Sequence, residues 1–345
     1  MARGSAIAMV VGAMLVSSGI AAAATVERDR GGRIVAPPDH QAETRILDDL
    51  LQSSGLSVQL DGLTASIRAQ FLRAHRRQSN QDRLTIDRIV AERFAPGTLY
   101  ARIKTEFQRD LDRGRLQKAL AWYDSPLGQR ITGQELAALI AAGGPAAVAD
   151  LERNPPSARR LELIERLDAV GGASETTVDV TVAIVRSLTV AFQPGLPAVA
   201  GLTRDQLDKQ IAQARNRTLE DMRRVCMVSM LLAYRGLSDD ELDQYVQFVE
   251  SDAGRWYMSV MNSALLAAIN AAADATASEL ATVMPQLVGD LRQIDICRRT
   301  VSAGARDRRY GVLKRIAPKK DSADDDVSSE SMASEIMPGL SGAAP

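Results

Sequence analysis

Apolar residues recur along most of the chain at the three- and four-residue spacing that places them on one face of an amphipathic helix. The clearest series is Leu56, Leu60, Leu63, Ile67 and Phe71. The segment 176–184 is ambiguous, because its valines and isoleucine alternate with other residues, as in a strand. Apolar residues at helical spacing also cover this segment, and its counterpart in the repeat described next is the helical series above. We therefore expect a helix here and an all-α fold throughout.

The same pattern occurs twice in the chain. Residues 46–55 (ILDDLLQSSG) are similar to residues 163–172 (LIERLDAVGG) at a shift of 117, and residues 122–128 (WYDSPLG) are similar to residues 248–254 (FVESDAG) at a shift of 126. Such a long internal period indicates a tandem duplication. The second copy has about nine additional residues between these anchors, and insertions usually lie in loops. We expect the insertion at 193–197 (QPGLP).

Glycine, proline and charge divide the chain into segments. The N-terminal part is expected to contain a signal peptide over 1–24 and a flexible linker over 25–43. Two homologous helical repeat domains in tandem, of four or five helices each, are expected over 44–142 and 158–291, joined by a linker over 143–157 with one short helix at 146–153. A basic segment over 292–317 and a disordered acidic tail over 318–345 complete the chain.

The strongest local signal is a corner between two helices that is present in both repeats. It consists of Trp122, Tyr123, Ser125, Pro126 and Gly128 in the first repeat, and of Phe248, Ser251, Asp252 and Gly254 in the second. The serine is the predicted N-cap of the following helix, and proline or aspartate suits the first helical position. We expect the first aromatic residue to pack in the angle of its corner and the glycine to permit a close approach. Apolar residues at helical spacing are usually core residues, and a binding role for the corner is the alternative.

Two further helix starts have the pattern of a capping box, in which side chain and backbone amides satisfy each other. They pair Thr203 with Gln206 and Ser238 with Glu241. The second box lies in the acidic cluster 239–241, which we therefore interpret as capping and solvated carboxylates rather than as an acid/base pair.

Residues 123–130 (YDSPLGQR), preceded by Leu116, by Leu120 and far upstream by residues 50–56, resemble the domain of unknown function 2059 family. The resemblance implies a helical protein secreted by bacteria that ends in an aromatic, Ser-Pro-x-Gly corner. Two copies would cover most of the chain between 44 and 291. The family brings no established activity, and no functional residue is transferred from it.

The first residues have the composition of a secretory signal peptide, with Arg3 followed by an uncharged run and by four alanines that end at Ala24. Cleavage near Ala24 would leave a soluble periplasmic or secreted protein, and an uncleaved membrane anchor is the alternative.

Export would also determine the oxidation state of Cys226 and Cys297, the two cysteines of the chain. We predict that they form a disulfide in an oxidising compartment. Two free, buried thiols are the alternative.

Charge and residue types exclude several functions. Lysine and arginine number 42 and aspartate and glutamate 43, and this balance disfavours nucleic acid as a general partner. The histidines are His40, in the predicted linker, and His75, beside two arginines on a predicted polar helix face. Neither has a helical neighbour to orient it, which disfavours triad chemistry and histidine-ligated zinc. Phosphate-binding loops and serine elbows do not occur in the sequence.

Methionine suggests one ligand. Met227 and Met230, and likewise Met258 and Met261, place two thioethers one helical turn apart. Soft sulfur ligands select Cu(I), although methionine also fills irregular helical cores. The basic stretch 298–320 could contact an anionic membrane surface or an acidic partner, or could be a solvated disordered segment.

These observations favour a non-enzymatic binding or protein-interaction module of the bacterial envelope, without a cofactor and without a transmembrane segment after signal cleavage. A carrier of a small apolar ligand or of Cu(I) between helices is the alternative. An enzyme of unknown class comes third.

Overall fold

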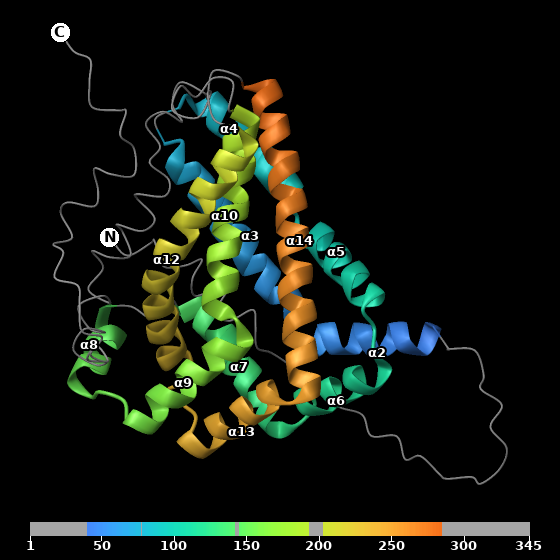
Figure 1. The fold of residues 1–345 in the computed structure, drawn as a ribbon, viewed down its shortest axis with the longest axis vertical. Coiled ribbons are helices and arrows are strands. Elements are labelled where there is room, and N and C mark those ends of the chain that lie inside the picture. Colours follow the sequence, from blue (N-terminus) through green and yellow to red (C-terminus); the bar gives the residue numbers. More distant parts are fainter. Residues whose placement is uncertain (1–39, 77, 142–144, 193–202, 285–345) are drawn as a thin grey trace.

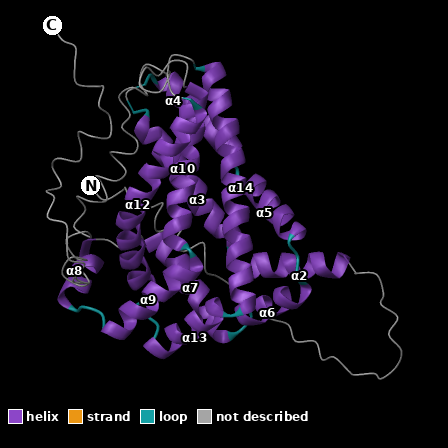
Figure 2. Cartoon of the chain, in the orientation of Figure 1, coloured by secondary structure: helices purple, strands orange, loops and turns teal. Residues whose placement is uncertain are grey.

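The computed structural model describes residues 40–76, 78–141, 145–192 and 203–284, and nearly all of these residues are helical (Figures 1 and 2). No strand occurs within these ranges. The predicted all-α fold is confirmed, and so is the helical interpretation of 176–184. The predicted signal peptide, the insertion site at 193–197, the basic segment and the acidic tail lie outside the described residues.

Helices follow one another with short connections. The helices of the first repeat are α2 (His40–Ser53), α3 (Leu56–Ala74), α4 (Asn80–Arg93), α5 (Pro96–Arg109), α6 (Arg113–Tyr123) and α7 (Pro126–Ala141). The helices that follow are α8 (Pro145–Arg153), α9 (Ala158–Gly171), α10 (Ala173–Phe192), α12 (Arg204–Ala233), α13 (Asp239–Glu250) and α14 (Asp252–Val283). The expected short helix between the repeats is α8. Helix α2 begins at His40, so the predicted linker extends too far.

The helices of the two repeats occur in the same order, with α2, α3, α6 and α7 matching α9, α10, α13 and α14. One position differs. The 30-residue α12 stands where the first repeat has two 14-residue helices, α4 and α5. Pro96 begins α5, and a proline inside a helix removes a hydrogen bond and clashes with the preceding turn. The described part of the first repeat therefore has six helices, α2 to α7, where we predicted four or five.

One glycine in each repeat makes the same left-handed turn between the first two helices. Gly55, between α2 and α3, has φ 54°, and Gly172, between α9 and α10, has φ 71°. A Cβ at Gly55 would lie 3.1 Å from a Leu136 methyl carbon, and a Cβ at Gly172 would lie 3.0 Å from the Asn262 side-chain nitrogen. Leu136 and Asn262 are themselves equivalent at the shift of 126. The duplication therefore preserves both the left-handed turn and the position against which it packs.

The two corners follow the predicted local structure. Ser125 Oγ accepts a hydrogen bond from the Gly128 amide at 3.0 Å, and Ser251 Oγ accepts one from the Gly254 amide at 3.1 Å. A Cβ on either glycine would come closer than 3.0 Å to the backbone oxygen of Trp122 or Phe248, a distance that real Cβ atoms essentially never show. Glycine is therefore needed where each new helix folds back over the carbonyl of the preceding one.

The aromatic residues of the two corners stack on each other. The rings of Trp122 and Phe248 lie 4.6 Å apart between centroids with an interplanar angle of 7°. We expected each ring to pack in the angle of its own corner and did not predict this contact between the corners. Contact between two equivalent residues is typical of a two-fold interface. The two corners thus cover each other's aromatic residues.

Ion pairs flank this contact on both sides. Arg115 of α6 donates to Asp252, the first residue of α14, at 2.9 Å. Arg130 of α7 forms an ion pair with Glu241 of α13. Arg115 and Glu241 are equivalent at the shift of 126. Each of them pairs with a residue in the first turns of the other repeat's last helix, but the first is a cation that pairs with an anion and the second is an anion that pairs with a cation.

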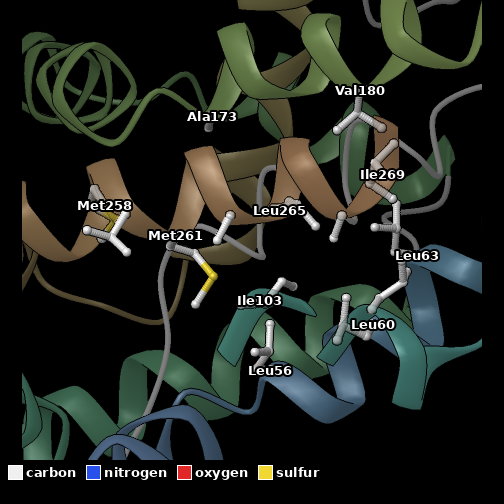
Figure 3. Packing of buried hydrophobic residues seen from close by; sticks show 14 of the residues in the cluster. Leu56, Leu60, Leu63, Ile103, Ala173, Val180, Met258, Met261, Leu265 and Ile269 are labelled. Carbon is white, nitrogen blue, oxygen red and sulfur yellow. The ribbon is translucent and has the colours of Figure 1, made fainter. Parts of the chain in front are cut away.

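One hydrophobic cluster contains residues from both repeats. Helix α14 runs through it over most of the height of the molecule and packs against α10 of its own repeat and against α4, α5 and α6 of the first (Figure 1). In Figure 3, Met261, Leu265 and Ile269 of α14 lie between Val180 of α10 and Ile103 of α5. Because the repeats share this core, their division into separate domains stays a prediction.

The corner glycines provide a test of this arrangement. We expect Gly128→Ala and Gly254→Ala each to lower the free energy of unfolding by roughly 1–3 kcal/mol, because the new methyl group would overlap a backbone oxygen. Urea denaturation of the purified chain measures the change. Gly133→Ala is the control, because Gly133 lies in α7 with nothing within 4 Å of its Cβ position. The control should gain up to about 1 kcal/mol from helix propensity, and equal losses in all three variants would contradict the corner geometry.

Candidate functional site

A buried carboxylate lies where the two repeats meet. Glu135 of α7 is 0% exposed. Its Oε1 accepts hydrogen bonds from the hydroxyl of Tyr234 at 2.5 Å and from that of Tyr245 at 3.3 Å. Burying a carboxylate is costly unless hydrogen bonds compensate it. Phenols from the second repeat therefore stabilise a carboxylate that belongs to the first.

The electrostatics of the site keep its phenols protonated. Burial, with the charge of Glu135 adding to it, raises the pKa of Tyr234 and that of Tyr245 well above the usual value. Burial also raises the pKa of Tyr257 to about 12. At neutral pH these phenols are hydrogen-bond donors. Tyr234 and Tyr245 act here as donors to a fixed carboxylate and not as bases.

Aromatic rings extend from this cluster through the contact between the repeats. Tyr123 of α6 meets Tyr257 of α14 edge to face at 5.1 Å between centroids, and meets Phe248 of α13 at 5.6 Å. Tyr234 and Tyr245 form a further edge-to-face pair at 5.9 Å. Edge-to-face contacts stabilise aromatic pairs beyond the burial of their area. The cluster therefore joins four helices around one carboxylate.

Sequence reasoning missed this cluster. Its only local signal is that Glu135 lies one helical turn after Ile131, which is 1% exposed. A charged residue on the apolar face of a helix needs a buried partner, and that rule could have identified Glu135. The partners themselves are 99 and 110 residues away, where no local pattern indicates them.

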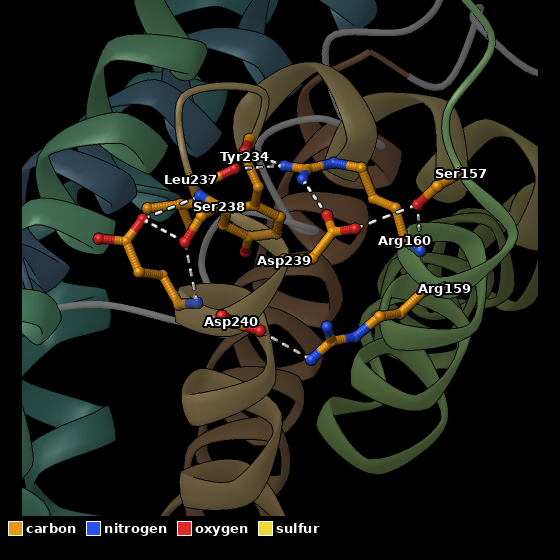
Figure 4. A network of polar contacts seen from close by, with 9 residues as sticks. Ser157, Arg159, Arg160, Tyr234, Leu237, Ser238, Asp239 and Asp240 are labelled. Carbon is orange, nitrogen blue, oxygen red and sulfur yellow. Dashed lines mark hydrogen bonds and ion pairs between the residues drawn. The ribbon is translucent and has the colours of Figure 1, made fainter.

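An arginine of α9 holds the loop that carries Tyr234 (Figure 4). Arg160 donates to Asp239 Oδ1 at 2.6 Å and to the backbone oxygens of Tyr234 and Leu237 at 2.6 and 3.0 Å. Ser157, the N-cap of α9, donates to the other Asp239 oxygen at 3.1 Å. One guanidinium thus fixes the turn between α12 and α13.

The acidic cluster at the start of α13 has the predicted capping role. The capping boxes at Ser238 and at Thr203 are both formed. Asp240 pairs with Arg159 at 2.9 Å. The predicted cap is therefore present, whereas the ion pairs that the carboxylates of 239–241 form between helices were not predicted.

The structure corrects the predicted position of both histidines. His40 is the first residue of α2 rather than part of a linker. His75 is 4% exposed, its Nδ1–H donates to the Phe71 oxygen at 2.8 Å, and its ring stacks on that of Phe71. The prediction of a polar helix face for His75 is wrong because α3 ends at Ala74, and the next residue leaves the helical path and turns into the core.

Cys226 is fully buried and has no disulfide partner among the described residues, and burial raises the pKa of its thiol to about 12. A protonated, buried thiol is a poor nucleophile and a poor metal ligand. Cys297 lies outside the described residues. The disulfide between them stays a prediction.

The methionines lie in hydrophobic surroundings. Met230, Met258 and Met261 are at most 3% exposed in the main cluster, and Met227 is partly buried between it and a small cluster beside α8. These positions agree with the alternative interpretation, in which the methionines fill a helical core. Cu(I) binding stays a prediction. In the part of the chain that the structure describes, no group of three or more histidine, cysteine, aspartate or glutamate side chains could hold a metal ion.

No family model matches the chain, and the comparisons with curated proteins and with solved structures also find no match. The resemblance to the domain of unknown function 2059 family stays a prediction. A search of the described residues finds no helix with the length and apolar character needed to cross a membrane.

The buried carboxylate can be tested by truncation. We expect Glu135→Ala to lower the free energy of unfolding by roughly 2–4 kcal/mol, because buried phenol hydroxyls lose their acceptor and a cavity forms. Glu165→Ala is the control, because Glu165 lies exposed on α9. Chemical denaturation compares the two. Similar small losses would show that Glu135 does not hold the repeats together.

The tyrosines predict an alkaline limit of stability. A phenol whose folded pKa is raised above its unfolded value contributes stability below the unfolded pKa of about 10 and loses it as pH rises through the folded value. We therefore expect stability to fall steeply above about pH 10. Phenolate absorbance should rise together with loss of helix, and Tyr245→Phe should weaken the pH dependence. Phenolate formation with the helical signal intact would contradict the burial of these rings.

Proposed function

We propose that the protein is a non-enzymatic interaction module exported to the bacterial envelope. The observation that carries this proposal is the burial of five potentially reactive groups in the described part of the chain. The Glu135 carboxylate, the phenols of Tyr234 and Tyr245, the His75 imidazole and the Cys226 thiol are each at most 4% exposed. A general acid, base or nucleophile has to reach its substrate within hydrogen-bond distance. In the described residues these groups hold helices together instead.

Export rests on the sequence. Residues 1–24 have the composition of a secretory signal peptide. The resemblance of the corner motif to the domain of unknown function 2059 family agrees with a secreted bacterial protein. The balanced charge of the chain favours a protein or small ligand over nucleic acid as partner.

Exposed apolar side chains are the first places to look for a partner, since apolar contacts supply most of the free energy of association. Among the described residues the exposed large ones are Leu84 at 64%, Val283 at 49%, Val58 at 47% and Val190 at 43%. Leu84 on α4 is the most exposed of them. The carrier alternative has less support, because the four methionines pack among alkyl groups.

Site-specific photo-crosslinking in intact envelopes tests the proposal. A photoreactive residue at position 84 of the full chain should give a discrete adduct with another envelope protein, and the same residue at Asn216, an exposed polar position on α12, should not. An apolar molecule or copper that remains bound in native mass spectrometry would instead support the carrier. Conversion of a substrate by the purified chain would support an enzyme.

The variant His75→Ala distinguishes a structural role of this imidazole from a catalytic one. We expect His75→Ala to lower the melting temperature, because its packing and capping contacts are lost. The adduct at position 84 should persist at temperatures where the variant remains folded by circular dichroism. Loss of function in the folded variant would contradict a non-enzymatic role for this imidazole.

A further inference from the structure

The contact between α2 and α6 in the first repeat and the equivalent contact between α9 and α13 in the second carry different charges. In the second repeat Arg166 of α9 donates two hydrogen bonds to Glu250, the last residue of α13, at 3.1 and 2.7 Å. The residue equivalent to Arg166 at the shift of 117 is Asp49 of α2, and the residue equivalent to Glu250 at the shift of 126 is Asp124, which caps α6. An ion pair in one repeat thus corresponds to two carboxylates in the other.

The surroundings of Asp124 disfavour its charge. Its Oδ1 atom is buried without a hydrogen-bond partner. Burial raises the pKa of Asp124, the charge of Asp49 raises it further, and a hydrogen bond from Ser53 only partly opposes these effects. The carboxylate is therefore held in its charged form only at a cost to the folded state.

Three charged groups on the neighbouring helices have ion-pair partners other than Asp124. Lys104 of α5 pairs with Asp48 of α2, and Arg130 of α7 pairs with Glu241. On α14, which packs against α6, Asp252 pairs with Arg115. On α2 itself Arg45 is exposed, four residues before Asp49.

Glu250 has the opposite environment. The hydrogen bonds from Arg166 lower the pKa of Glu250, and the charge of Arg255 on α14 also contributes, whereas partial burial opposes them. Oδ1 of Asp243, on the same helix as Glu250, lies 3.9 Å from the third guanidinium nitrogen of Arg166, Nη1.

We propose that these two equivalent contacts respond to acid in opposite directions. A proton on Asp124 tightens α2 against α6, because it removes a buried charge and the repulsion from Asp49. A proton on Glu250 loosens α9 from α13, because it removes the ion pair with Arg166. The two halves of one duplicated fold would thus form a device that reports acidity, and this inference does not rest on the proposed function.

The pH windows follow from the directions of the pKa shifts. A carboxyl group with a raised folded pKa destabilises the fold at high pH, and this penalty disappears as pH falls from above that pKa toward the ordinary aspartate value of about 3.9. A carboxyl group with a lowered folded pKa contributes stability above the ordinary glutamate value of about 4.3, and this contribution is lost as pH falls through the lowered value. Mild acid should therefore strengthen the first contact before stronger acid weakens the second.

Isosteric variants of the full chain test the proposal by thermal unfolding across pH. At neutral pH Asp124→Asn should melt above the wild type, and the matched variant Glu250→Gln should melt below it, each by about 1–4 °C. Both differences in melting temperature should vanish as the pH is lowered. The difference for Asp124→Asn should vanish at a higher pH than the difference for Glu250→Gln. Asp124→Asn melting below the wild type at neutral pH, or pH-independent differences, would overturn the proposal.

A third variant converts one contact into the other. Asp49→Arg should raise the melting temperature at neutral pH, because the first repeat gains the pair that Arg166 forms in the second, and this gain should now be lost in acid. Hydrogen exchange of the wild type, corrected for the intrinsic effect of pH, provides a test without substitution. Protection of 40–53 should rise between neutral pH and about pH 5, and protection of 158–171 should not. Parallel behaviour of the two segments would refute the proposal.

Discussion

The stacking of Trp122 on Phe248 is the contact on which the rest of the structure depends. It requires each corner to be tight enough to present its aromatic ring, and this in turn requires glycine at positions 128 and 254. Once the rings stack, the last helix of each repeat is directed across the other repeat. Helix α14 then reaches α4 and α5, and the two halves bury one core. Local backbone geometry thus determines the packing of the whole molecule.

The buried carboxylate is a consequence of that packing. Glu135 lies on the face of α7 that is turned toward the second repeat, where the hydroxyls of Tyr234 and Tyr245 donate hydrogen bonds to it and help to compensate its burial. Arg160 in turn fixes the loop that ends in α13. Breaking a buried pair by removing one partner is strongly destabilising. The cluster therefore makes the pairing of the repeats specific as well as stable.

The sequence predicted the parts of this fold that are local. Serine caps such as Ser125 and Ser251 bond to an amide three residues away, and the spacing of apolar residues follows the helical period, so both could be recognised within a short window. The duplication resolved the helix at 176–184. The partner of Trp122 and the acceptor for Tyr234 depend on contacts between segments far apart in the chain, and the burial of His75 depends on the exact residue at which α3 ends. No local pattern specifies those, which is why they were missed or wrong.

Comparison of the repeats shows which constraints the duplication retained. Positions that determine the backbone are the same in both, including the left-handed Gly55 and Gly172 and the capping serines of the corners. Positions that only carry charge have diverged, from Arg166 and Glu250 to Asp49 and Asp124 at one contact, and with reversed signs at the ion pairs that flank the corners. A partly exposed charge changes stability little, so it can vary, whereas a side chain on a corner glycine would collide with a backbone oxygen. Differences in function between the two halves are therefore to be sought in their charges, since their shared backbone leaves little else free to change.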